Sequence, residues 1–485
     1  MANPYKWLLA ACAGAAGVFA GSRMLAHQAV KQIGKILTTD PYDENLAEMF
    51  SAAYRVGIQN ILETNLRAES GTVINRPLGS PRKTINFDGL SFSPVFLTRL
   101  PTPHHTKVDT KTVIGKHCRK PMILSTPIII SGMAYGLAVS RDAKLAMAKA
   151  SALAGTAANT GEGLWLPEER ELAENLIIQY NRGSWSKDPA ILKQADMIEI
   201  QLGQGAIAGI SHYTPASKLP PHLLPKLNLE KSGDLVVNAY HKEFLEPGGF
   251  AKLVTRLREI TGGVPIGIKM AFTNTIEQDI DIAAEAGVDV LALEGTIAAT
   301  KGAPPILEDD FGLPTIVGLC RAVDHLDKRG LKDRISLIAS GGFFTPGDML
   351  KALALGADAV YIGSIALFAM SHTQSFKALP FEPPTQIVWE TGKYRSRFQW
   401  KKGAVSLAKF ITSCTLEMAE GVRALGKTAI SQVDRSDLVA LDETTAAVTG
   451  IPLAWHRKSQ SGDHPSSQKS ESASPVQASP AKDKP

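Results

Sequence analysis

The chain has 485 residues, of which 44% are hydrophobic and 20% are charged, and its formal net charge is +5. This composition excludes a disordered or fibrous protein, and the absence of a long basic block with interleaved aromatic residues argues against a nucleic-acid partner. The four cysteines, Cys12, Cys118, Cys320 and Cys414, are far apart, so we predict no metal site and a reducing compartment.

Residues 1–37 form an N-terminal hydrophobic segment. Its stretch 7–22 carries no charge but consists mostly of Ala and Gly, and it is shorter than the roughly 20 apolar residues of a spanning helix. Three interpretations stay open: a membrane anchor, a cleaved signal peptide and a soluble Ala-rich helix. The corresponding location is the cytoplasm, with or without anchoring to the inner membrane through residues 7–22.

Residues 38–120 are expected to form an arm that packs on a larger domain. The spacing of apolar residues predicts helices between Gln28 and Leu66. From Gly71 to Lys120 the sequence is irregular and rich in Pro, Gly and His.

Residues 121–435 alternate short apolar strands with helices. The first predicted strand is Met122 to Ile130, and a Ser-capped amphipathic helix follows from Ser140 to Leu153. Seven further strands are predicted at 155–159, 176–180, 197–202, 266–271, 289–293, 335–339 and 359–362. Eight such strands over about 250 residues indicate a (β/α)8 TIM barrel with an N-terminal helical and irregular extension. A doubly wound open sheet is the alternative, but no G-x-G-x-x-G follows the first strand.

Two connections are unusually long. The fourth, residues 203–249, and the sixth, residues 294–314, should lie over the carboxyl ends of the strands as a lid or substrate loop. After the barrel we expect a C-terminal extension at 436–456. Residues 457–485 have almost no apolar content and should be disordered.

Glycines end the last two predicted strands. Gly341 and Gly342 follow the seventh strand, and Gly363 and Ser364 follow the eighth. Glycine allows close approach of the backbone to a ligand, and the helix that begins after each exit offers free N–H groups. This pattern predicts a phosphate-bearing cofactor. The alternative is that these are ordinary turn glycines.

Lys269 lies inside an apolar strand, where an unpaired charge would be costly. A flavin would suit it, because a fixed cation stabilises the reduced ring. The alternative is a structural ion pair with Glu199 or Glu294.

Other polar residues follow the second, third and fourth strands. Glu162 lies between two glycines and could act as an acid, a base or a hydrogen-bonding group, or could be a helix-start carboxylate. Gln179 and Gln204 could bind a flavin or a substrate, or satisfy buried backbone groups. His212, His222 and His241 show no metal-ligand spacing and are taken as surface residues.

An ordered set of motifs resembles the FMN-binding synthase domain of glutamate synthase. The matching segments are 127–136, 159–163, 177–179, 198–205, 268–269, 295–304 and 340–342. The whole chain is similar to stand-alone FMN-binding glutamate synthase family proteins, which lack the glutaminase domain and the iron–sulfur cysteines.

This resemblance implies an FMN site and names its residues. Ser131, Gly132 and Met133 would lie near the ring, Gln179 and Lys269 at its polar edge, and Gly341, Gly342, Gly363 and Ser364 at the phosphate. Asn159, Gly295, Gly302 and Ser340 complete the cofactor-binding set. Lys269, Glu162 and Gln204 are the candidate catalytic residues.

The implied reaction is reduction of 2-iminoglutarate, made from 2-oxoglutarate and ammonia, or of a related imine or 2-oxo acid. Gln201 stands where the family has a lysine, and the basic run after it is replaced by residues 206–219, which puts the substrate in question. The alternatives are an FMN enzyme for another 2-hydroxy acid or an amine, and a non-catalytic flavin-binding barrel. The donor is NAD(P)H or a redox protein, and the protein is a monomer or a homo-oligomer.

Overall fold

The structure, a computed structural model, describes residues 4–42, 45, 47–227, 229 and 233–455. Eight parallel strands form one sheet in the order β4-β13-β12-β11-β10-β7-β6-β5. The strands are β4 (Ile128–Ile130), β5 (Ala157–Asn159), β6 (Asn175–Tyr180), β7 (Met197–Gln201), β10 (Ile266–Ala271), β11 (Val290–Glu294), β12 (Ser336–Ser340) and β13 (Ala359–Ile362). The end strands meet, since the Thr156 hydroxyl donates to the Ile128 carbonyl oxygen at 2.6 Å. The predicted (β/α)8 TIM barrel is confirmed.

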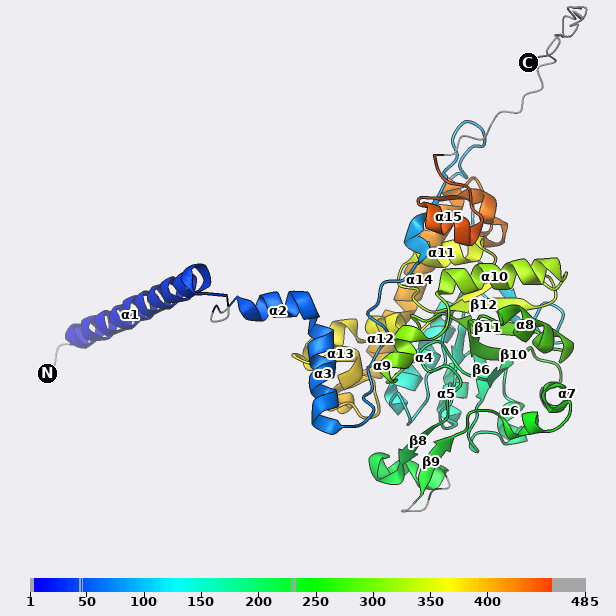
Figure 1. The fold of residues 1–485 in the computed structure, drawn as a ribbon, viewed down its shortest axis with the longest axis horizontal. Coiled ribbons are helices and arrows are strands. Elements are labelled where there is room, and N and C mark those ends of the chain that lie inside the picture. The colour runs from blue at the N-terminus through cyan, green and yellow to red at the C-terminus, as the bar shows by residue number, and fades with distance from the viewer. Residues whose placement is uncertain (1–3, 43–44, 46, 228, 230–232, 456–485) are drawn as a thin grey trace, which may run out of the picture.

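Helices surround the sheet (Figure 1). They are α4 (Arg141–Ala154), α5 (Pro167–Leu172), α6 (Pro189–Leu192), α7 (Gly249–Thr261), α8 (Ile276–Glu285), α9 (Pro305–Asp310), α10 (Thr315–Lys328), α11 (Pro346–Ala354) and α12 (Ser364–Ser371). After the barrel come α13 (Pro383–Ile387) and the long α14 (Trp400–Ala424), which packs against α4 and α12. The Ser140 hydroxyl caps α4 by accepting from the Ala143 amide, as its sequence predicts.

One sequence prediction about regular structure is wrong. The stretch Met122 to Ile130 is two strands: β3 (Met122–Leu124) pairs antiparallel with β2 (Thr112–Ile114), and only β4 belongs to the barrel. Pro127 lacks an amide hydrogen and separates them. The fourth connection contains a hairpin of β8 (His212–Pro215) and β9 (Asp234–Val237) rather than irregular chain alone.

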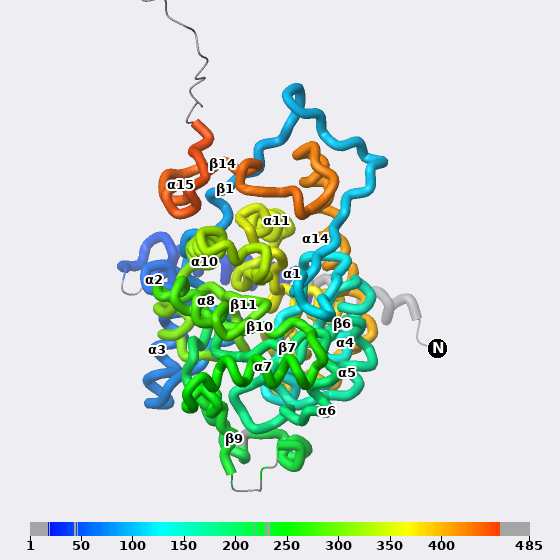
Figure 2. Tube along the Cα trace, turned by 90° about the vertical axis from the view of Figure 1, so that its right-hand side faces the viewer, coloured from blue at the N-terminus to red at the C-terminus, as the bar shows by residue number. Residues whose placement is uncertain are grey.

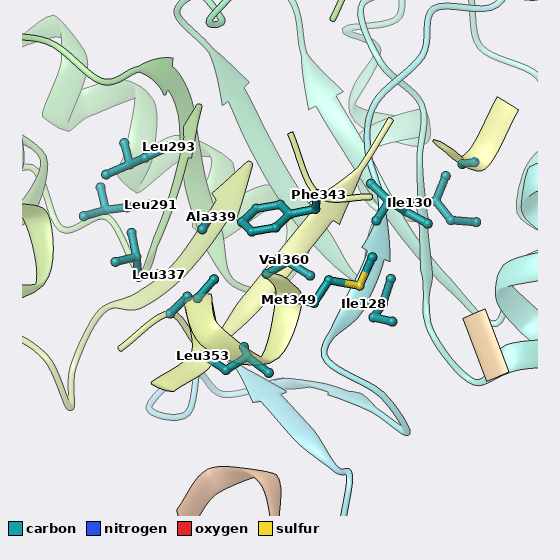
Figure 3. Close-up of a cluster of buried hydrophobic side chains, with 14 of the residues drawn as sticks. Ile128, Ile130, Leu291, Leu293, Leu337, Ala339, Phe343, Met349, Leu353 and Val360 are labelled. Atoms are coloured by element: carbon teal, nitrogen blue, oxygen red, sulfur yellow. The ribbon is translucent and has the colours of Figure 1, made fainter. Parts of the chain in front are cut away.

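The hydrophobic core has two layers. Outward-facing side chains of β4, β11, β12 and β13 belong to one buried cluster with Met349 and Leu353 of α11 (Figure 3). Inside the barrel a smaller cluster contains Ile129, Met197 and Ile338, and Leu124 of the hairpin joins it from the amino-terminal end. Each fully buried side chain of this size contributes about 1.5–3 kcal/mol, so the lower barrel is a packed core and not a channel.

Among the described residues, three α-helices lie between the N-terminus and the barrel. Helices α1 (Pro4–Thr39) and α2 (Glu48–Val56) extend away from the barrel, and α3 (Ile58–Ser70) returns toward it (Figure 1). Residues 7–22 belong to α1, and no helix in the described part of the chain has both the length and the apolar character needed to cross a membrane. Residues 457–485 lie outside the described ranges.

Arg76 fixes the arm to the sixth connection. Its guanidinium donates to Asp309 of α9 at 2.7 and 2.9 Å and to Glu63 of α3 at 2.7 Å. A second attachment lies further along the chain, where β1 (Leu90–Phe92) pairs with β14 (Leu438–Ala440) beside α15 (Glu443–Thr449) (Figure 2). The arm therefore packs on both the sixth connection and the C-terminal extension.

Candidate active site

A layer of polar side chains lies above the apolar interior, at the end of the barrel where the strands have their carboxyl ends; we call this end the mouth. Alternate residues of a strand point to the same side, so positions two residues beyond the inner apolar cluster also face inward. The buried members are Ser131, Asn159, Gln179, Glu199, Gln201, Lys269, Glu294, Ser340 and Tyr361.

Lys269 is the central cation of this layer. Its Nζ lies 3.0 Å from Glu294 Oε1 and donates to Ser131 Oγ at 3.2 Å. Burial acts to lower its pKa, but the carboxylates of Glu294 and Glu199 outweigh burial and raise the pKa above its usual value. Lys269 is therefore a permanent cation. An ammonium has three N–H donors, and within the described residues Nζ has these two hydrogen-bonding partners, which leaves one donor for a ligand.

Glu199 organises the neighbouring strands. Its carboxylate accepts hydrogen bonds from Asn159 Nδ2 at 2.8 Å, Gln179 Nε2 at 2.8 Å and the Tyr361 hydroxyl at 2.6 Å. Burial and the charge of Glu199 raise the pKa of Tyr361 well above its usual value, so this hydroxyl remains a donor. The network fixes side chains from four strands in one arrangement.

Two glycine-containing loops pack backbone against backbone beside this network. Gly161 has φ +66°, and a Cβ there would lie 2.7 Å from the backbone of Met133. A Cβ on Gly132 would lie 2.8 Å from Asn159 Oδ1. Below them Lys144 donates to the Asn159 carbonyl oxygen at 2.7 Å and pairs with Glu169 at 2.7 Å. The close packing of the two loops therefore depends on glycine at positions 132 and 161, and Lys144 holds the start of the loop 159–163.

The glycines after β12 and β13 form a second part of the mouth. These strands are neighbours, with Ser340 opposite Tyr361. Gly341 and Gly342 have φ of +105° and +79°, and within the described residues no acceptor is bonded to the amides of Gly341, Gly342 or Gly363. A Cβ on Gly363 would meet no atom within 4 Å. The uncapped start of α12 follows directly.

These observations fit a phosphate and a flavin ring. Free amides at two adjacent strand exits and a helix start suit a phosphate. The spare donor of Lys269 suits the polar edge of a flavin. Gln201 Oε1 is also buried and has no hydrogen-bond partner in the described part of the chain, so it too can receive a ligand donor.

The predicted residues of the long connections take different positions. Gln204 accepts from Gln201 at 3.3 Å and donates to Thr300 Oγ1 at 3.2 Å, which joins the fourth connection to the sixth. The Gly295 amide donates to the Ser340 carbonyl oxygen at 3.0 Å. Gly302 is exposed and lies against Asn75 of the arm. Lys301 donates to the Leu137 carbonyl oxygen at 2.7 Å, so the sixth connection touches the first loop of the mouth.

Sequence reasoning missed Arg182 and misplaced His241. The Arg182 side chain is 0% exposed, and its Nε faces Glu162 Oε1 at 3.5 Å. His241 is buried, not a surface residue, because it packs between the tilted rings of Tyr180 and Phe244 and its Nε2 lies 2.8 Å from the Gln201 carbonyl oxygen. Burial lowers the pKa of His241 to about 4, which keeps the ring neutral. The only sequence signal for Arg182 is its position two residues after a strand that ends at the mouth.

The fold and this site define the chain as an FMN-dependent oxidoreductase. The family model "Conserved region in glutamate synthase" matches residues 95–428, which is more than half of the chain. The chain therefore belongs to the glutamate synthase family.

Individual relatives agree with this assignment. A glutamate synthase large subunit-like protein of Rhizobium meliloti is 31% identical over 81% of this chain and 93% of its own length. An archaeal glutamate synthase [NADPH] of Archaeoglobus fulgidus is 34% identical over 52% of this chain, which spans about half (49%) of that relative. Among solved structures, a mutant flavocytochrome b2 with bound pyruvate aligns at 18% identity over 91% of this chain and 98% of its own, with a TM-score of 0.49.

Proposed function

We propose that the protein reduces 2-iminoglutarate, formed from 2-oxoglutarate and ammonia, or a related imine or 2-oxo acid, with FMN as its cofactor. Family membership supports the reaction class. The observation that carries the proposal is Lys269, a buried cation with one N–H to spare, held between Ser131 and Glu294 at the mouth.

The residues present can hold FMN in one orientation. Gly341, Gly342, Gly363 and Ser364 would take the phosphate through their amides. Lys269 would stabilise negative charge at the N1 and O2 edge, and the loop 131–133 would support the ring. When bound, the flavin supplies hydride transfer between the electron donor and the substrate.

Glu162 and Gln204 are proposed to act on the substrate side. The Glu162 side chain is 14% exposed, so its carboxylate can accept hydrogen bonds from an incoming ammonium ion. Gln204 bridges the fourth and sixth connections and would help to exclude water from the substrate.

The electron donor is proposed to be NADPH, on the strength of the name of the Archaeoglobus relative. A separate redox protein is the alternative. We also propose the chain organisation expected from the sequence, with residues 121–435 as the FMN-binding barrel and residues 38–120 as its arm. Size-exclusion chromatography tests for a homo-oligomer, and flotation with vesicles tests whether residues 7–22 associate with a membrane.

The decisive experiment combines a spectrum with an assay. The purified full chain should show flavin absorption after incubation with FMN, and anaerobic NADPH or a reduced redox protein should bleach it. Glutamate should then form from 2-oxoglutarate and ammonium chloride, measured by mass spectrometry. A protein that binds no flavin refutes the proposal.

Gln201 favours a second candidate function. An uncharged amide stands where the family has a lysine, so the enzyme could act on a different 2-hydroxy acid or an amine. Reoxidation of the reduced protein by a panel of 2-oxo acids, each with and without ammonium, separates the two candidates. A bound flavin that no donor reduces would instead indicate a non-catalytic flavin-binding barrel.

A further inference from the structure

Arg182 is a buried cation that the mechanism above does not use. It follows β6 in the connection to α6, and its side chain is 0% exposed. Its Nη1 donates to the carbonyl oxygens of Gly209 at 3.0 Å, Ile210 at 3.2 Å and Ala239 at 3.4 Å. Its Nη2 is buried and has no hydrogen-bond partner in the part of the chain that the structure describes.

The charge of Arg182 is incompletely compensated. A buried cation is stable only when it is paired and hydrogen-bonded. The ion pair that the structure shows for it, with Glu162, spans 3.5 Å through Nε alone. Nε and Nη2 of a guanidinium form a planar fork that matches the two oxygens of a carboxylate. The contact at Nε is long and Nη2 has no partner among the described residues, so the Nε and Nη2 edge of the guanidinium can bind an anion.

The surroundings place this fork at the mouth. Arg182 is three residues beyond Gln179, and the Trp185 indole on the same connection donates to the Glu162 carbonyl oxygen at 2.8 Å. The carbonyl partners of Nη1 belong to the fourth connection, and Asn238 of that connection donates to the Arg182 carbonyl oxygen at 2.9 Å. Arg182 thus joins the exit of β6 to the segment that covers the substrate side.

We propose that Arg182 binds a carboxylate of an acidic substrate through Nη2 and Nε. This inference deepens the proposed function and rests on it for the reaction. Binding would replace the long contact with Glu162 by two charge-assisted hydrogen bonds, and it would release the Glu162 carboxylate. The family has a lysine on the fourth strand where this chain has Gln201. Arg182, which follows the third strand, would supply a cation in its place.

Carboxylate binding can be measured without turnover. The FMN-loaded protein is titrated with 2-oxoglutarate, with glutarate and with the neutral analogue glutaramide, and changes in the flavin spectrum give each Kd. R182Q should raise the Kd of both carboxylates by about 10- to 100-fold, as expected for loss of hydrogen bonds to a charged group. The Kd of glutaramide should not change, and R182K should fall between R182Q and the wild type.

Kinetics separate binding from a structural role. R182Q should raise the KM for the 2-oxo acid much more than it lowers kcat, and reduction of the flavin by the donor should keep its wild-type rate. R321Q is the matched control, because it removes the α10 arginine of a partly exposed ion pair with Glu277 of α8, and it should change neither quantity.

Three results would overturn the inference: a wild-type Kd for carboxylates in R182Q, an equal loss of glutaramide binding, or a wild type that binds no carboxylate. If R182Q does not fold, R182K decides, and an unchanged Kd in R182K overturns the inference. Carboxylate binding that depends on Arg182 without glutamate formation would refute the proposed reaction and leave the inference standing.

Discussion

Two buried lysines, Lys144 below the glycine loops and Lys269 in the mouth, differ in how completely their ammonium groups are bonded. Lys144 Nζ donates to the carbonyl oxygens of Asn159 at 2.7 Å and Thr160 at 3.3 Å and forms an ion pair with Glu169 at 2.7 Å. Lys269 Nζ has two hydrogen-bonding partners in the described part of the chain, both at 3.0 Å or more. A buried ammonium group whose three N–H donors all have partners, here called saturated, stabilises the fold. An unsaturated one, with a donor left over at a strand end, can bind a ligand.

Removal of the unsaturated lysine should have the largest effect on catalysis. K269Q deletes the charge that we propose faces the flavin edge and should lower kcat by up to about 1,000-fold, as for loss of one preorganised electrostatic contact. The reduction potential of bound FMN should become more negative, because reduced flavin loses its counter-charge. Wild-type kcat and potential in K269Q would contradict the comparison.

Removal of the saturated lysine should affect stability instead. K144M leaves Glu169 buried without its partner and should cost about 3–5 kcal/mol in the free energy of unfolding, measured with urea. K144M/E169L replaces the pair by apolar side chains and should recover most of that loss. The folded K144M protein should keep kcat within a few-fold. A large loss of kcat with unchanged stability would show that Lys144 belongs to the active site.

His241 is a third buried basic side chain. It differs from the two lysines because the fold keeps it neutral. Burial lowers its pKa to about 4 from 6.5, so in that interval the unfolded chain binds a proton that the folded chain does not. Stability from the neutral ring is present above about pH 6.5 and is lost as the pH falls toward 4.

At about pH 5.5 the loss should be about 1.4 kcal/mol relative to neutral pH. H241F should remove this component of the pH dependence of unfolding, while H222Q, at an exposed histidine, should keep it. Identical pH profiles for H241F and the wild type would show that His241 titrates normally in the folded protein.

The smallest effect should come from the glycines after β12 and β13, where we propose that the phosphate binds. A Cβ on Gly363 meets no protein atom within 4 Å, so G363A should fold as the wild type does. The added methyl group should interfere only with a bound phosphate and raise the Kd of FMN by about 5-fold, or about 1 kcal/mol. G34A, in α1 and equally unhindered, is the control, and the two Kd values are compared by fluorescence titration. Equal Kd values would place the phosphate elsewhere.

The sequence was sufficient for seven of the eight barrel strands and for several inward polar residues, Ser131, Gln179 and Lys269 among them, but it did not single out Tyr361. Apolar runs with period-two alternation predicted β10 and β13 at the bounds the structure shows, and Lys269 stood out because it interrupts such a run. Pro127 was the missed signal that the first predicted run is two strands.

Residues in connections could not be predicted in this way. Arg182 and His241 are buried because segments distant in sequence cover them: Gly209 and Ala239 lie over Arg182, and Tyr180 packs against His241. The pattern of apolar residues within one strand does not reveal which distant segments will bury a residue in a connection. The number of partners of Lys144 and Lys269, on which the comparison depends, likewise requires the three-dimensional structure.

The bond between Arg76 and Asp309 also sets an order of assembly. The two residues are 233 positions apart, so a growing chain presents Arg76 long before its partner exists. At the roughly 5–20 residues per second of translation, the interval is about 10 to 50 seconds. The arm emerges from the ribosome before the barrel but docks late, and the loop that carries Thr300 toward Gln204 gains its support only after most of the barrel has been synthesised.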